Sequence, residues 1–105
     1  MNLPQTSQAF ELFTKEASAH AEAWLVAVQK LSAASALDQK TAHLAYLAVL
    51  AALRLDSGIP FHTLLAKRAG ASRPEVIGAL MVGLPAAGNA VIQALPAALA
   101  AYDSE

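Results

Sequence analysis

The stretch QKTAHLAYLAVLAALRLDSGIPFHTLLAKRA, residues 39–69, decides the fold of this 105-residue chain. Between Leu44 and Leu53 every position is apolar, which is typical of a helix enclosed by others. Asp38 precedes this helix and is a natural N-cap. The Asp-Ser-Gly-Ile-Pro break at residues 56–60 ends the helix, and a second helical run follows. We therefore predict a central antiparallel hairpin of two helices.

The rest of the chain also has helical periodicity, and no segment alternates as a strand would. An amphipathic segment over residues 7–34 predicts one helix or two. Gly70 predicts a helix end, and Ser-Arg-Pro-Glu at residues 72–75 predicts a capping box that opens the next helix. A last helix is expected over residues 87–102, with a kink at Pro96. These elements predict an all-α fold of about five or six helices in a single domain.

The composition favours a protein that buries much of its surface in an assembly. Hydrophobic residues make up 56% of the chain and charged residues 14%, against about 25% charged in an average soluble domain. We interpret the apolar excess as subunit interface, and expect a homo-oligomer. The net charge of −1 gives no reason to expect a nucleic-acid partner.

Two features bear on membranes and location. Residues 76–102 carry no charge and exceed the roughly 20 residues that span a bilayer. Pro85, Asn89 and Pro96 interrupt this stretch, so we predict buried helices that form an interface and no membrane span. The N-terminal residues lack a basic segment followed by an apolar one, so we expect no signal peptide and a cytoplasmic protein.

Residues 63–80 also fit the pattern of a helix-turn-helix. In such a motif the second helix must present side chains that read base edges in the major groove. This one presents Ile77, Gly78, Ala79 and Leu80 after a lone Arg73. We keep DNA binding only as a third hypothesis.

A second resemblance covers more of the chain. The segments LDQKTAHLAYLAVLAALRL (37–55) and HTLLAKRAGASRPEVIGALMVGLPAAGNAVIQALPAAL (62–99) resemble the carboxymuconolactone decarboxylase and alkylhydroperoxidase D (AhpD-like) family. The similarity runs over about residues 37–102, which leaves residues 1–36 as an N-terminal helical extension. The resemblance implies an AhpD-like helical fold and assembly as a trimer or hexamer, with a dimer-based assembly as the alternative.

Redox members of that family carry a Glu, two Cys and a His spaced E-x11-C-x2-C-x3-H. On this sequence the four positions are His43, Leu55, Gly58 and His62. The chain has no cysteine, so we predict that the thiol peroxidase activity of the family is lost. The decarboxylase branch works without the cysteine pair and stays available.

The candidate catalytic residues are His62 and His43, because imidazole titrates near neutral pH and can move protons. A purely structural role for either remains an alternative. His43 lies 12 residues before Leu55, about 18 Å along a straight helix. We therefore expect the two imidazoles to meet only if the helix bends or another subunit contributes.

Tyr46 and Asn89 are candidate ligand-binding residues, since each is polar within an apolar segment. We expect no metal and no cofactor. The first hypothesis for function is proton-transfer chemistry on a small lactone or organic acid. The second is a non-catalytic oligomer that binds a small molecule or acts as a scaffold, so the sequence leaves open whether the protein is an enzyme.

Overall fold

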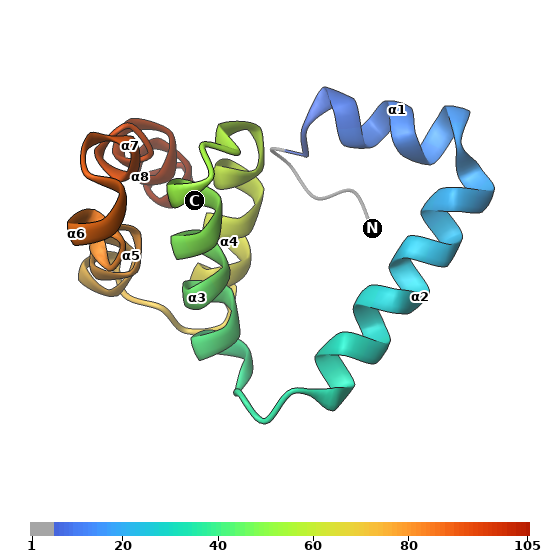
Figure 1. The fold of residues 1–105 in the computed structure, drawn as a ribbon, viewed down its shortest axis with the longest axis horizontal. Coiled ribbons are helices and arrows are strands. Elements are labelled where there is room, and N and C mark those ends of the chain that lie inside the picture. The colour runs from blue at the N-terminus through green and yellow to red at the C-terminus, as the bar shows by residue number, and fades with distance from the viewer. Residues whose placement is uncertain (1–5) are drawn as a thin grey trace.

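The computed structural model describes residues 6–105, and every regular element among them is helical (Figure 1). The elements are α1 (Gln8–Glu16), α2 (Ser18–Ala34), α3 (Gln39–Ala52), a 3-10 turn η1 (Asp56–Gly58), α4 (Ile59–Arg68), α5 (Arg73–Met81), α6 (Leu84–Ala87), α7 (Asn89–Ile92) and α8 (Leu95–Asp103). The all-α prediction is confirmed. Residues 1–5, part of the segment in which we expected no signal peptide, lie outside the described residues.

Helices α3 to α8 form a compact body around the predicted hairpin. Helix α4 packs antiparallel on α3 and also contacts α8, while α5 and α7 pack on α3 (Figure 1). Leu47 and Ala51 of α3 and Ile59 and Ala66 of α4 have no exposed surface. The alanines let the helix axes approach closely, because they add little bulk between the backbones.

The predicted start and stop signals are confirmed. The Asp38 carboxylate accepts a hydrogen bond of 2.8 Å from the Thr41 N–H and caps α3. Ser72 and Glu75 form the expected capping box at the start of α5. Gly70 ends α4 with φ +100°, in the left-handed region that favours glycine.

Several predicted helices are divided, so the described residues hold more helices than the five or six expected. Ala17, with φ −129° and ψ 51°, separates α1 from α2. The predicted single helix over residues 87–102 is wrong, because Gly88 at φ +60° separates α6 from α7 and a further break precedes α8. Pro96 does not kink a helix. It lies in the first turn of α8, where its missing N–H has no helical partner to lose.

Helices α1 and α2 form an arm that extends away from the body (Figure 1). They pack chiefly against each other, and Ala21 is their one buried residue. The expectation that α3 is enclosed on all sides is also wrong for this chain alone. Tyr46 and Val49, on the part of α3 that faces away from α5, are 47% and 50% exposed. None of the described helices is both long enough and apolar enough to cross a membrane.

Candidate functional site

The two predicted catalytic histidines lie on the antiparallel helix pair. His43 and Tyr46 are three residues apart on α3, so they share one face of that helix. The ring of His62, on α4, lies 4.5 Å from the ring of Tyr46 between centroids. The ring centroid of Phe61 lies 5.0 Å from that of the same imidazole, with the two ring planes at 89°. The structure thus joins His62 to the face that carries His43.

Our expectation that the two histidines meet only through a bent helix or another subunit is therefore wrong. The estimate of about 18 Å counted only the rise along α3. It omitted the return of α4 beside α3, which brings His62 back from the turn toward the start of α3. As a result, the charge of His43 acts on His62 within one chain.

Burial makes both imidazoles weak bases. It lowers the pKa of His62 to about 4, because the low-dielectric surroundings disfavour the charged ring, and the nearby His43 lowers it further. Burial also lowers the pKa of His43. Both rings are therefore neutral at pH 7. Within residues 6–105 no hydrogen bond holds either ring, so each nitrogen is available to a ligand.

A neutral imidazole has one nitrogen that accepts a hydrogen bond and one that donates. Two such rings on one face can accept a proton from one atom of a ligand and donate a hydrogen bond to another, and a ring that has taken up a proton can pass it on. Among the described residues no group of three His, Asp or Glu side chains is placed to hold a metal ion. The chemistry that this face can supply with its own side chains is proton transfer.

The turn between α3 and α4 holds the two positions that correspond to the cysteines of redox proteins. Arg54 ends α3 with φ +58°, and its guanidinium binds the Asp56 carboxylate at 3.0 and 3.2 Å. Leu55, at the first cysteine position, is 51% exposed. A Cβ added to Gly58, at the second, would lie 3.7 Å from Cδ2 of His62, an ordinary contact. The turn retains room for both side chains.

Asn89 does not join this face. It is exposed at the start of α7, which packs on α3, α5 and α6. No hydrogen bond, ion pair or ring contact connects it to the histidines within residues 6–105. Tyr46 is part of the face through a tilted ring contact with His62, in which the ring planes lie at 48° to each other.

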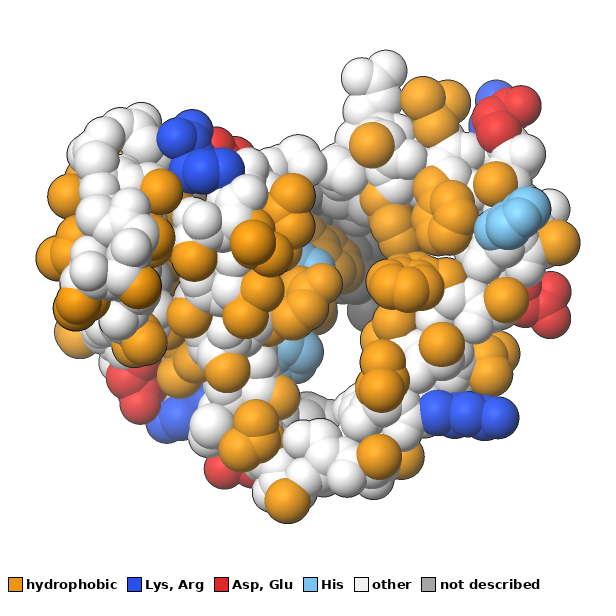
Figure 2. Space-filling model, viewed as in Figure 1, with side chains coloured by type: hydrophobic (Ala, Val, Ile, Leu, Met, Phe, Trp, Pro, Cys, Tyr) orange, Lys and Arg blue, Asp and Glu red, His pale blue; other side chains and the backbone are white. Residues whose placement is uncertain are grey.

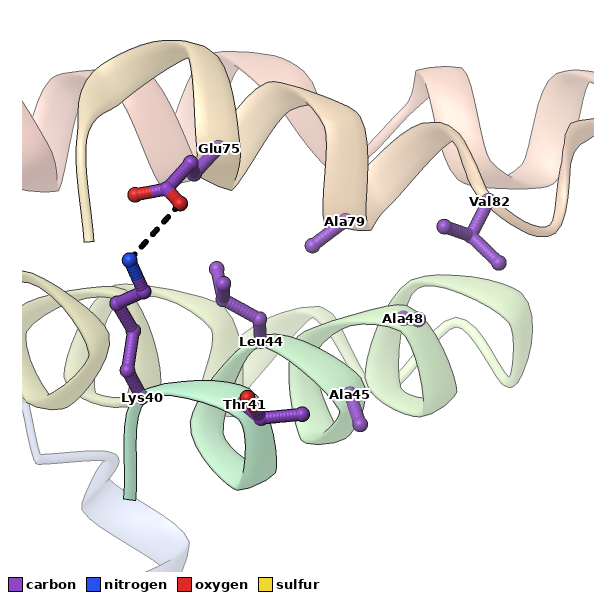
Figure 3. Close-up of a pocket in the computed structure, with 8 residues that line it drawn as sticks. All are labelled: Lys40, Thr41, Leu44, Ala45, Ala48, Glu75, Ala79 and Val82. Atoms are coloured by element: carbon purple, nitrogen blue, oxygen red, sulfur yellow. Dashed lines mark hydrogen bonds and ion pairs between the residues drawn. The ribbon is translucent and has the colours of Figure 1, made fainter. Parts of the chain in front are cut away.

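The sequence analysis missed a groove between α3 and α5. It has a volume of about 470 Å³ and a mostly apolar lining. Figure 3 shows Ala79 and Val82 facing Leu44, Ala45 and Ala48, with Lys40 and Glu75 at one end. Lys40 and Glu75 form an ion pair of 2.9 Å. Small residues at spacings of three and four on both helices could have predicted a groove. That pattern does not show which two helices pack together.

These features define a small cysteine-free helical domain with two neutral histidines on one antiparallel helix pair. The model of the carboxymuconolactone decarboxylase family matches residues 17–101, and the chain belongs to this family. The resemblance to this family is thereby confirmed. The match begins 20 residues before the stretch that carried the resemblance, and so it includes α2. No curated protein and no solved structure matches the chain.

The depressed pKa of His62 predicts how stability depends on pH. Histidine in an unfolded chain has a pKa of about 6.5, so between that value and about 4 the unfolded state binds more protons. The stabilisation is complete above pH 6.5 and is lost as the pH falls. We expect the free energy of unfolding to fall by about 1 kcal/mol between pH 7 and pH 5. This figure already allows for the partial exposure of the ring, which weakens the effect.

Urea unfolding at several pH values tests this prediction. His62→Gln should flatten the dependence between pH 5 and pH 7. His20→Gln, at an exposed position of α2, should leave it unchanged. An unaltered slope in His62→Gln would show that the imidazole is not held neutral by burial.

The room at the α3–α4 turn predicts that the missing sulfurs can be restored. We expect Leu55→Cys/Gly58→Cys to fold and to form an intramolecular disulfide under mild oxidation, because Leu55 precedes the 3-10 turn and Gly58 ends it, with the Gly58 N–H donating to the Leu55 carbonyl at 3.1 Å. Mass spectrometry with and without thiol alkylation measures it. The single variants serve as controls and should remain free thiols. A double variant that stays fully alkylatable after oxidation would contradict this geometry.

Proposed function

We propose that this protein catalyses proton transfer on a small organic acid or lactone, with His62 as the base and His43 as the second proton carrier. The observation that carries the proposal is the placement of two neutral imidazoles on one face, with the ring of Tyr46 in contact with that of His62. We also propose that the thiol peroxidase activity of the family is absent, because the chain contains no sulfur nucleophile.

An acidic substrate suits this face for an electrostatic reason. A histidine with a pKa of about 4 is a weak base when the site is empty. A bound carboxylate places a negative charge beside both rings, which raises their pKa values and makes each a stronger base. The substrate itself would thereby bring the catalytic groups toward the pH at which they work best.

The proposed step needs no oxidant or reductant. Neutral His62 accepts a proton from the carbon beside the carboxyl or lactone carbonyl, and the bonding electrons stay on the substrate. The bound carboxylate raises the pKa of His43, so His43 takes up a proton from water and donates it to another atom of the same molecule. Water returns the two rings to their starting charge states, so protons and electrons balance.

A second candidate is binding of a small molecule without catalysis. The α3–α5 groove favours it, because an apolar floor beside a Lys40–Glu75 ion pair suits a small ligand with one polar end. The groove and the histidine face lie on different helix pairs, so substitutions can separate the two functions.

The test is a panel of small lactones and 2-oxo acids followed by absorbance and NMR. We expect turnover that falls at least about 100-fold in His62→Gln, the range that general base catalysis contributes, and less in His43→Gln. His20→Gln is the matched control and should keep full activity. Equal rates in wild type and His62→Gln would exclude His62 from the reaction. Saturable binding without turnover, weakened by Ala79→Phe in the groove, would select the second candidate.

A further inference from the structure

We propose that the α1–α2 arm of one copy docks on the body of a second copy and covers its His43–His62 face. The docking of the arm is inferred from the apolar surfaces alone. Its role in catalysis rests on the proposed function. In this arrangement the site of each copy is incomplete until the arm of its partner closes over it.

The arm has an apolar surface that nothing in its own chain covers. Helix α2 has 17 residues, of which only Ala21 is buried. Its large hydrophobic side chains are exposed, with Trp24 at 56% and Leu31 at 70%. A helix with so many apolar positions and so few charges is normally enclosed by other elements. An unsupported helix of this length is only marginally stable in water, so the arm needs a partner.

The body presents a matching surface. Tyr46, Val49 and Leu53 form one stripe of α3 and are 47%, 50% and 63% exposed, and Leu55 continues it at 51%. Figure 2 shows hydrophobic side chains on both sides of the opening between arm and body, with histidine side chains on the side of the body. The charged side chains of the arm lie on its outer side. Docking of these two surfaces would therefore bury no charged side chain without a partner.

The linker keeps the arm of a chain away from its own body. Residues 35–38 join α2 to α3, and Asp38 is fixed as the N-cap of α3. The Ser35 hydroxyl accepts a hydrogen bond of 3.1 Å from the Leu37 N–H, which holds the extended turn. With this short connection, the opening between the arm and the body of the same chain stays unfilled. It also has the form of a hinge from which an element can be exchanged between identical chains.

A second copy is the occupant that the surface area favours. Six side chains of the arm are 42% to 70% exposed: Leu12, Trp24, Leu25, Val26, Val28 and Leu31. Of these, Trp24, Val28 and Leu31 share one face of α2 and present on the order of 350 Å², against about 800 Å² that each partner buries in a standard interface. The exposed stripe of α3 adds to this area. In a two-fold arrangement each arm covers the stripe of the other copy, so all four surfaces are buried at once.

The docked arm would change the chemistry of the histidine face. The face opens toward the gap in the single chain, as Figure 2 shows. A second apolar helix laid across it would exclude water and strengthen the interaction of both imidazoles with a bound carboxylate. The arm of the partner therefore acts as the lid of a site whose floor is the α3–α4 pair.

The absence of cysteine from the chain permits a direct test by mixing single-cysteine variants. One set carries Trp24→Cys or Leu31→Cys on the arm, and the other carries Val49→Cys on the stripe. We expect a short bismaleimide to link arm and stripe variants into a heterodimer when they are mixed. Val49→Cys mixed with Lys30→Cys, which places the cysteine on the outer side of the arm, should link at least 10-fold less. His20→Cys replaces the arm variant as a second control.

Light scattering and activity complete the experiment. Wild type should have at least the mass of a dimer, and Leu25→Glu/Leu31→Glu should shift toward monomer with an affinity at least 100-fold weaker, while Lys30→Glu should not. A monomeric wild type, or a link that forms only within a chain carrying Leu31→Cys/Val49→Cys together, would overturn the proposal. Crosslinking without turnover on the panel would refute the proposed catalysis and leave the docking intact. Turnover by a monomer would refute the docking and leave the proposed catalysis intact.

Discussion

The antiparallel packing of α4 along α3 is the contact on which the other features of the molecule depend. It buries Leu47 and Ala51 against Ile59 and Ala66, and it supplies the platform on which α5, α7 and α8 pack. The same return of the chain sets His62 against Tyr46 and within electrostatic range of His43. If α4 left the turn in another direction, the core would open and the two imidazoles would separate together.

The turn that joins these helices holds the two positions that the family resemblance assigns to cysteines of redox members, Leu55 and Gly58. Gly58 has an ordinary φ, and a side chain there would meet only normal contacts. The backbone of the turn therefore does not exclude a side chain at Gly58. What remains at the motif positions is His62, joined by a second histidine where the resemblance implies a glutamate. A carboxylate at that position would raise the pKa of His62, whereas a second imidazole lowers it.

The sequence predicted the hairpin, the caps at Asp38 and Ser72 and the helix end at Gly70, because each of these depends on a few neighbouring residues. It did not predict the approach of His43 to His62, since that depends on how two helices pack after a turn. The break at Gly88 was missed because apolar residues at helical spacing lie on both sides of it, whether or not the chain bends there. The groove between α3 and α5 was missed for the same reason as the histidine pair. The spacing of residues within one segment does not predict which distant helices pack together.

The central claim is that the α3–α4 pair holds two interacting, neutral imidazoles on one face. An NMR titration of the histidine ring resonances in wild type and in His43→Gln tests it most directly. We expect His62 to titrate with a pKa of about 4, and its pKa to rise when His43 is replaced, because one neighbouring positive charge is removed. A pKa of about 6.5 for His62, unchanged in His43→Gln, would contradict the account.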